Sequence, residues 1–153
     1  MHLTAKRKDA DLLEDQLRGA WPAEGSPVTL IGYWEGDYEP GWPNVMDFVD
    51  EQWDQAERDR VASYLEAGFV PWIQMGISPC RMCGAANGSA EQTDGVYIWP
   101  EGLAHYVRAH GVRLPVSVIR HIHTRCAEIG ASEVKTHPEL VNREWWRTAT
   151  LAS

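Results

Sequence analysis

Two cysteines with two residues between them, Cys80 and Cys83, constrain the fold of this chain more than any other feature of its sequence. His105 and His110 follow, so that the pattern is C-x2-C-x21-H-x4-H. Zinc prefers thiolate and imidazole ligands in a tetrahedron, and a CxxC turn brings two sulfurs to one point. The histidine spacing is typical of zinc fingers, whereas the middle interval exceeds the dozen or so residues of the short finger. We therefore expect a modified finger in which Cys80, Cys83, His105 and His110 bind one structural zinc ion.

The two histidines must meet a geometric condition to bind the same ion. Five positions along an ideal α-helix rotate a side chain by about 140°, so His105 and His110 converge only if the last turn is distorted or His110 ends the helix. Gly111 favours such an end. Otherwise one of the two is a core histidine. Cys126 falls on the apolar stripe of a helix predicted over 115–129 and is expected in the core. The substitute ligands are His121, His123 and Cys126.

Other chemistry for the cysteines fits the sequence less well. A redox CxxC should open a helix after a strand, whereas Pro79 precedes the pair and the glycine-rich residues 84–88 follow it. A zinc deaminase requires a His-x-Glu element ahead of Pro-Cys-x-x-Cys, and none is present. An open catalytic site would need a carboxylate base, but Asp94 fits a turn and Glu101 a helix start. Four nitrogen and sulfur donors predict a closed, structural site.

The acidic residues outside the cysteine–histidine pattern are expected on the solvent-exposed surface. The acidic residues of the helices predicted from residue 44 lie mostly at outward positions, which favours a solvated face over a metal cage. The loop at 34–37 holds two acids that could serve acid–base chemistry, although exposed loop acids are usually just solvated. The GxSxG, P-loop and dinucleotide-binding patterns are absent. The acidic run comprises Asp47, Asp50, Glu51, Asp54, Glu57 and Asp59.

Length and composition predict one soluble domain over residues 1–153. The chain is 44% hydrophobic, and no run of about 18 apolar residues could span a bilayer. The first residues lack the apolar core of a signal peptide, and three cysteines suit a reducing compartment better than a disulfide framework. We therefore expect a cytoplasmic protein.

Charge and tryptophan content bear on the partner. Residues 1–103 carry 7 basic and 18 acidic residues, a balance of −11, and residues 104–153 carry 7 and 4, a balance of +3, which together give −8. An acidic chain repels phosphate backbones, so nucleic-acid binding is disfavoured. The basic last third could face an acidic partner or the acidic part of the same molecule. Eight tryptophans indicate either a Trp-rich core, which we favour, or an exposed binding platform.

Hydrophobic periodicity predicts an α+β fold with a small, mostly antiparallel sheet packed by about five or six helices. A ββα zinc-finger-like element is expected within it at about 69–111. The predicted strands are 28–34, 69–75 and 95–99, and the predicted helices are 9–20, 44–53, 54–67, 100–110, 115–129 and 138–149.

The run TDGVYIWPEGLAHYVRAHGVRLP, preceded by CRMCG, resembles a motif of small, largely uncharacterised bacterial proteins. The similarity covers about residues 76–116, roughly a quarter of the chain. It implies that the two cysteines and the two histidines form a shared element, and it supplies no reaction.

These observations lead to two hypotheses from different classes. The first is a cytoplasmic, zinc-containing protein-interaction or regulatory module with a protein partner, no membrane and no catalysis. The alternative is a small enzyme with a pocket near the 34–42 loop and His121 or His123, in which zinc is still structural. Nucleic-acid binding by the finger is a third, disfavoured reading.

Overall fold

The computed structural model describes residues 27–37, 39–73, 76–125, 136 and 138–153. The helix predicted at 9–20 and the residue Cys126 lie outside these ranges. Among the described helices, none has the length and apolar character that crossing a membrane requires. In chain order the elements are β1 (Val28–Leu30), the 3-10 helix η1 (Val45–Phe48), α2 (Gln55–Glu66), β2 (Glu91–Thr93), β3 (Tyr97–Pro100), α3 (Leu103–His110), α4 (Val116–Arg125), the 3-10 helix η2 (Pro138–Leu140), β4 (Val141–Asn142) and α5 (Glu144–Arg147).

The sheet is mixed, with strand order β2-β3-β1-β4. β2 and β3 form an antiparallel hairpin, but β1 pairs in parallel with both β3 and β4. The prediction of a mostly antiparallel sheet is therefore wrong. The two strands of a parallel pair are distant in sequence, so no pattern of neighbouring residues predicts that they pair. β2 has the polar sequence Glu-Gln-Thr and β4 only two residues, so neither gives a strand pattern.

The strand predicted at 69–75 is only partly formed. Its described residues make isolated antiparallel bridges, Phe69 with Thr93 and Ile73 with Ala90. Pro71 lacks the N–H that a continuous ladder needs. The segment therefore lies beside β2 as an interrupted edge, and the predicted ββα element uses the β2–β3 hairpin instead.

The described residues contain four α-helices and two 3-10 helices, which corrects the prediction of five or six packing helices. Asp54 caps α2 by accepting a hydrogen bond from the Glu57 N–H. The segment after Asn44 forms only the short η1, because Val49 is extended. The helix predicted at 138–149 is split into η2, β4 and α5, where the pairing of β4 with β1 overrides helical periodicity.

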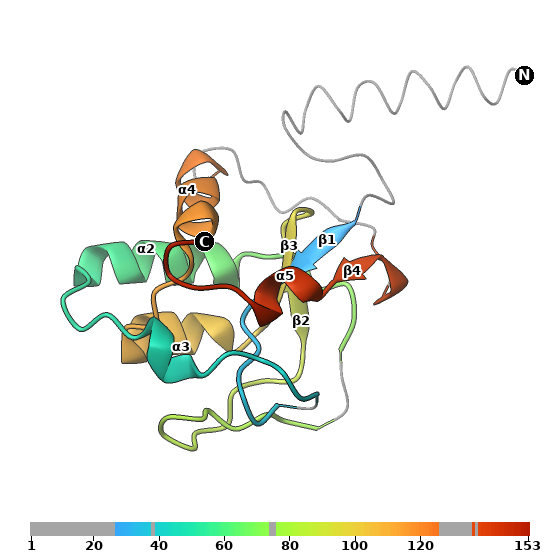
Figure 1. Cartoon of the computed structure of the whole chain (residues 1–153), viewed down its shortest axis with the longest axis horizontal. Coiled ribbons are helices and arrows are strands. Elements are labelled where there is room, and N and C mark those ends of the chain that lie inside the picture. Colours follow the sequence, from blue (N-terminus) through green and yellow to red (C-terminus); the bar gives the residue numbers. More distant parts are fainter. Residues whose placement is uncertain (1–26, 38, 74–75, 126–135, 137) are drawn as a thin grey trace, which may run out of the picture.

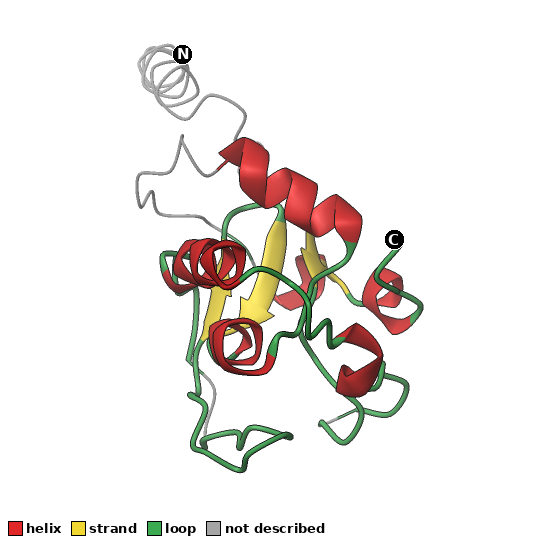
Figure 2. Cartoon of the chain, turned by 90° about the vertical axis from the view of Figure 1, so that its left-hand side faces the viewer, coloured by secondary structure: helices red, strands yellow, loops and turns green. Residues whose placement is uncertain are grey.

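Helices α2, α3 and α4 gather on one side of the sheet, as the two views in Figures 1 and 2 show. α5 packs against β1. The indole N–H of Trp146 on α5 donates to the Tyr33 carbonyl at 2.6 Å. Trp146 and Phe48 each lie 5.3 Å from Trp34 by ring centroid, in edge-to-face contact. This aromatic cluster joins the chain after β1 to η1 and α5.

The tryptophans belong to the core, as the favoured interpretation predicted. Every tryptophan that the structure describes is buried or half-buried against other apolar side chains. The high tryptophan content therefore forms no exposed binding platform within the described residues. The buried ones are Trp34, Trp42, Trp53, Trp99 and Trp146, and the half-buried ones are Trp72 and Trp145.

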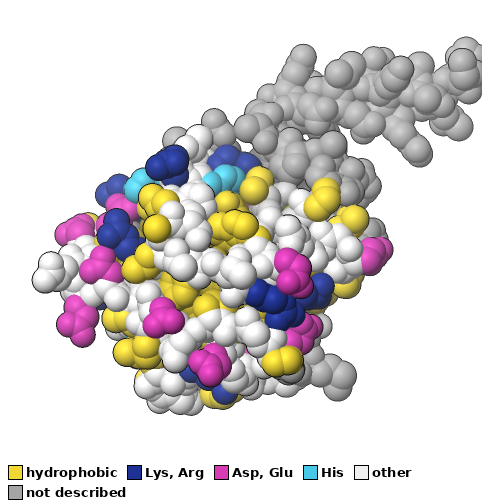
Figure 3. Space-filling model, in the orientation of Figure 1, with side chains coloured by type: hydrophobic (Ala, Val, Ile, Leu, Met, Phe, Trp, Pro, Cys, Tyr) yellow, Lys and Arg dark blue, Asp and Glu magenta, His cyan; other side chains and the backbone are white. Residues whose placement is uncertain are grey.

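Ion pairs join the acidic and basic parts of the chain to each other. Basic and histidine side chains gather over α4 and acidic ones over α2 on the face in Figure 3. Each exposed pair contributes little stability, but the pairs give three of the basic residues after position 103 acidic partners within the chain. The pairs are Arg108 with Asp59 and Glu66, Arg113 with Asp50, His123 with Glu57, and Arg147 with Glu39.

We predict that Trp146→Ala lowers the free energy of unfolding by about 3–5 kcal/mol, the usual cost of truncating a buried tryptophan. The neighbouring Trp145 is only half-buried, so Trp145→Ala should cost clearly less. Urea denaturation followed by circular dichroism measures both. Equal losses of unfolding free energy in the two variants would show that the aromatic cluster around Trp34 does not contribute this much to stability.

Candidate metal centre

The cysteines lie in a tight turn whose backbone closes on itself. The Cys80 N–H donates to the Ala85 carbonyl and the Gly84 N–H to the Cys80 carbonyl, each at 2.8 Å. Gly84 has φ of 75°, a left-handed conformation that glycine adopts without strain. The Met82 N–H points to the Cys80 Sγ at 3.4 Å. Both sulfurs are free thiols, and the turn opens no helix, as the metal interpretation requires.

The end of α3 satisfies the condition on the histidines. His110 is the last residue of α3, and Gly111 follows with φ of 65°. The Gly111 N–H bonds back to the Tyr106 carbonyl, which closes the helix end. As a result the rings of His105 and His110 lie 4.9 Å apart by centroid despite their five-residue separation.

Cys80, Cys83, His105 and His110 form one cluster of potential ligands. One ligand atom from each lies within 4.8 Å of all the others, and Cys83 Sγ is 3.4 Å from His105 Nε2. Ligand atoms around tetrahedral zinc are roughly 3.3–3.8 Å apart, given bonds of about 2.0–2.3 Å. The four side chains are therefore close enough to hold a metal ion.

The His110 side chain supports this assignment independently. Its Nε2 is buried and has no hydrogen-bond partner among the described residues, which is uncommon for a native polar atom. Burial, with the charge of the nearby His105, lowers the pKa of His110. The imidazole therefore favours the neutral form, in which it binds metals.

Polar contacts hold the cysteine turn against α3 and against the loop after β1. The Arg81 N–H donates to the Tyr106 hydroxyl at 2.7 Å. Burial raises the pKa of Tyr106 to about 12, so this hydroxyl keeps its proton. The Arg81 guanidinium pairs with Asp37 at 2.7 Å and donates to the Gly36 carbonyl at 2.8 Å. Such outer contacts orient the ligands of metal sites.

The two substitute histidines and the general-base candidates lie elsewhere, and Cys126 is outside the described residues. His121 bonds to Asp94 at 2.7 Å, and His123 bonds to Glu57. Glu101 accepts the Ser89 N–H at 2.7 Å. Within the described ranges, the acidic run of α2 and its surroundings forms no group of ligands comparable to the cysteine–histidine cluster.

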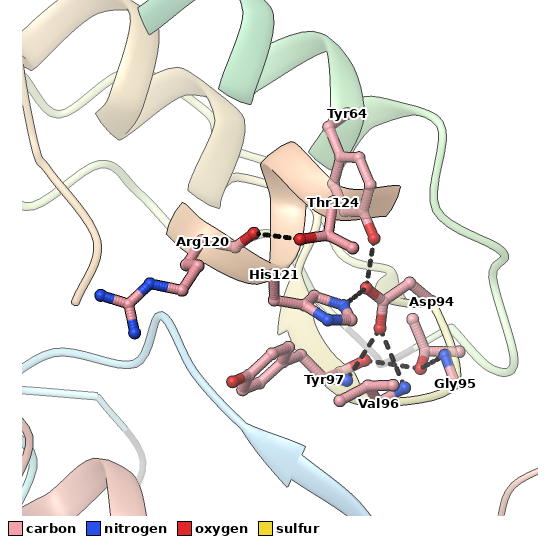
Figure 4. Close-up of polar contacts among 9 residues, drawn as sticks. Tyr64, Asp94, Gly95, Val96, Tyr97, Arg120, His121 and Thr124 are labelled. Atoms are coloured by element: carbon pink, nitrogen blue, oxygen red, sulfur yellow. Dashed lines mark hydrogen bonds and ion pairs between the residues drawn. The ribbon is translucent and has the colours of Figure 1, made fainter. Parts of the chain in front are cut away.

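A buried carboxylate network was not recognised from the sequence (Figure 4). Asp94 is 3% exposed and accepts hydrogen bonds from the Tyr64 hydroxyl of α2 and from His121 of α4. Its other oxygen accepts the N–H groups of Val96 and Tyr97 at 2.9 and 2.8 Å. The turn role predicted for Asp94 is confirmed by these last two bonds. Its distant partners gave no local signal.

The electrostatics of Asp94 follow from these contacts. Burial by itself raises the pKa of the Asp94 carboxyl. The hydrogen bonds from His121, Tyr64 and the Tyr97 N–H, with the charge of His121, outweigh it and hold that pKa below 3.8. The carboxylate is therefore more stable in the folded chain than in the unfolded one.

A cavity borders the loop predicted to carry the alternative enzyme's pocket. It is lined by Tyr33, Trp34 and Asp37 together with residues around the cysteine turn. Neither His121 nor His123 is among its described lining residues. This cavity therefore does not join the loop to those histidines, and the alternative pocket stays a prediction.

No protein-family model, curated protein or solved structure matches this chain. Its function has to be argued from the site itself.

We predict that Asp94→Asn lowers the free energy of unfolding at neutral pH by about 1.5–3 kcal/mol, the range for hydrogen bonds to a charged group. Because the folded pKa of Asp94 is lowered, its stabilisation is present above 3.8 and is lost as the pH falls through and below that value. The difference between the two proteins in urea denaturation should therefore shrink in acid. Asp47→Asn, at an exposed position, is the control. An undiminished difference in acid would contradict the carboxylate's role.

Proposed function

We propose that this chain is a protein-interaction module in which Cys80, Cys83, His105 and His110 hold a structural zinc ion. The observation that carries the proposal is the convergence of their four ligand atoms within 4.8 Å. Two thiolates and two imidazoles are ligands that zinc prefers. Magnesium and calcium instead take oxygen ligands, which these four side chains do not offer. When bound, zinc would tie the cysteine turn to the end of α3.

A structural role is favoured over a catalytic one by the number and surroundings of the donors. Four protein ligands complete a tetrahedron and leave no position for water. The carboxylates near in sequence are engaged elsewhere, since Asp94 is bound by Tyr64 and His121 and Glu101 by the backbone at Ser89. The site therefore has neither an open position nor a base directed to one.

Exposed apolar side chains support a protein partner. Val70, Ile73 and Ile77 are 41%, 72% and 66% exposed, and they occur along the interrupted edge that leads into the cysteine turn. Single exposed hydrophobic residues are ordinary, whereas several on one segment suit an interaction surface. The charge asymmetry and the tryptophans add little support, because ion pairs account for part of the asymmetry and the core accounts for the tryptophans. The proposal of a partner therefore depends on Val70, Ile73 and Ile77, which we call the apolar edge.

We predict one zinc ion per purified chain, measured by plasma emission spectrometry. Cys83→Ser should abolish this content and lower the melting temperature by about 10 °C or more, since a chain of this size shifts by roughly 2–4 °C per kcal/mol and a structural zinc contributes several kcal/mol. Cobalt substitution reports the geometry, because a tetrahedral sulfur–nitrogen site absorbs strongly in the visible range. His105→Ala and His110→Ala should each weaken that absorption.

The control for this experiment is Cys126→Ser, the same chemical change at the third cysteine. It should leave the zinc content unchanged. A melting temperature that is insensitive to chelator would refute a stabilising metal. Full zinc occupancy in His105→Ala and His110→Ala would show that the histidines are not ligands.

We predict that Ile73→Glu and Ile77→Glu weaken binding to a protein partner by at least about tenfold, because a charge replaces apolar contact area. Cross-linking of the full chain in cells identifies the partner, and biolayer interferometry with the purified partner measures the affinity. Met46→Glu changes another exposed apolar residue, which lies on η1, and should have no effect. Unchanged binding in both edge variants, or equal loss in the control, would contradict this surface.

A further inference from the structure

The two cysteines of the metal centre differ in their access to solvent. Cys80 is 3% exposed, whereas Cys83 is classed with the exposed residues. The space beside Cys83 is also open, because a Cβ atom added at Gly84 would meet no heavy atom within 4 Å beyond its chain neighbours. A small solute can therefore reach the Cys83 sulfur from solvent, while the protein covers that of Cys80.

Hydrogen bonds distinguish the same two sulfurs. The Met82 N–H donates to the Cys80 Sγ at 3.4 Å. The Tyr106 hydroxyl accepts the Arg81 N–H at 2.7 Å and has a side-chain hydrogen bond with Cys80. Because the hydroxyl oxygen is the acceptor for Arg81, its proton is available to the Cys80 sulfur. Donors of this kind stabilise a thiolate and lower its nucleophilicity.

Cys83 has no comparable donor within the described residues. The one hydrogen-bonding contact of its Sγ there is His105 Nε2, at 3.4 Å. His105 is itself a proposed ligand, and an imidazole nitrogen that binds a metal carries no proton to donate. In the zinc-loaded chain Cys83 is therefore the exposed thiolate and the one without a donor.

The two sulfurs are also close enough to react with each other. Their Sγ atoms lie within 4.8 Å. The Gly84 N–H donates to the Cys80 carbonyl, which makes the segment a single helical turn in which residues three apart are neighbours. A disulfide requires a sulfur–sulfur bond of about 2.05 Å. A small tightening of this turn, which contains no regular helix or strand, brings the sulfurs to that distance.

We propose that Cys83 is an oxidation site for a peroxide and that Cys80 is the cysteine that resolves the oxidised form into a disulfide. The proposal rests on the proposed zinc centre, because it describes how that centre is regulated. Zinc holds both sulfurs as thiolates, which is the form that a peroxide attacks.

The chemistry takes two steps. The Cys83 thiolate attacks one oxygen of hydrogen peroxide, so that a sulfur–oxygen bond forms, the oxygen–oxygen bond breaks and hydroxide leaves. The Cys80 thiolate then attacks the sulfenic sulfur of Cys83, so that the disulfide forms, the sulfur–oxygen bond breaks and a second hydroxide leaves. The two thiolates together give two electrons to one peroxide. The site loses two of its four donors, so it releases the metal until a thiol reductant restores the cysteines.

Mapping of the first oxidised sulfur tests the order of attack. In the full, zinc-loaded Cys126→Ser chain, Cys80 and Cys83 are the remaining cysteines, and trypsin cleavage after Arg81 places them on separate peptides. The chain is treated with less than one equivalent of hydrogen peroxide in the presence of dimedone, which traps sulfenic acid, and the adducts are located by mass spectrometry. We expect at least about tenfold more adduct on Cys83 than on Cys80, since trapping follows exposure and thiolate reactivity. The same chain unfolded in urea with chelator is the control and should be trapped to similar extents at both cysteines.

Release of the metal is followed in the same protein without dimedone, by the colour of a zinc-binding dye. We expect one zinc ion released for each disulfide formed, and recovery of zinc binding after dithiothreitol. Adduct that is equal on the two cysteines or greater on Cys80, or zinc retained at peroxide concentrations that oxidise glutathione, overturns the proposal.

Zinc content measured before oxidation separates this proposal from the proposed function. A chain that holds one zinc ion but shows no preference for Cys83 contradicts the oxidation site and leaves the structural zinc in place. A chain purified without zinc contradicts both, since the thiolates described here depend on the metal.

Discussion

The buried carboxylate of Asp94 is the interaction on which the placement of the other elements depends. Burying an ionised group is costly unless hydrogen bonds replace water. Its partners come from α2, from α4 and from the turn that starts β3. All must be in place together, so the network fixes the hairpin against two helices. Because α3 follows β3 directly, the same network sets where His105 and His110 lie.

The cysteine turn, by contrast, has little packing of its own. Residues 76–89 form no regular helix or strand and are joined by a few backbone bonds, such as those between Ser78 and Gly88 and between Cys80 and Ala85. Cys80 is buried, but Cys83 is exposed. A short segment without a core gains most from a cross-link, and bound metal is a common one in small folds. The proposed zinc therefore supplements packing where packing is weakest.

How much could be read from the sequence depended on how local the signal was. The cysteine turn, the cap at Asp54 and the helix end at Gly111 follow from neighbouring residues, and the structure contains all three. The parallel pairing of β1 with β4 joins residues over a hundred positions apart, and the local periodicity after Pro138 predicts one helix instead. Asp94 showed only its turn role, since Tyr64 and His121 lie 30 and 27 positions away.

Part of the charge asymmetry that suggested an acidic partner is satisfied inside the molecule by the ion pairs of Arg108, Arg113 and Arg147. The surroundings of the cysteine turn therefore bear more directly on function. Ser78, Pro79 and Tyr106 line the cavity and also adjoin or contact the turn that presents the metal ligands. A turn that shifted without metal would therefore change the wall of this cavity as well.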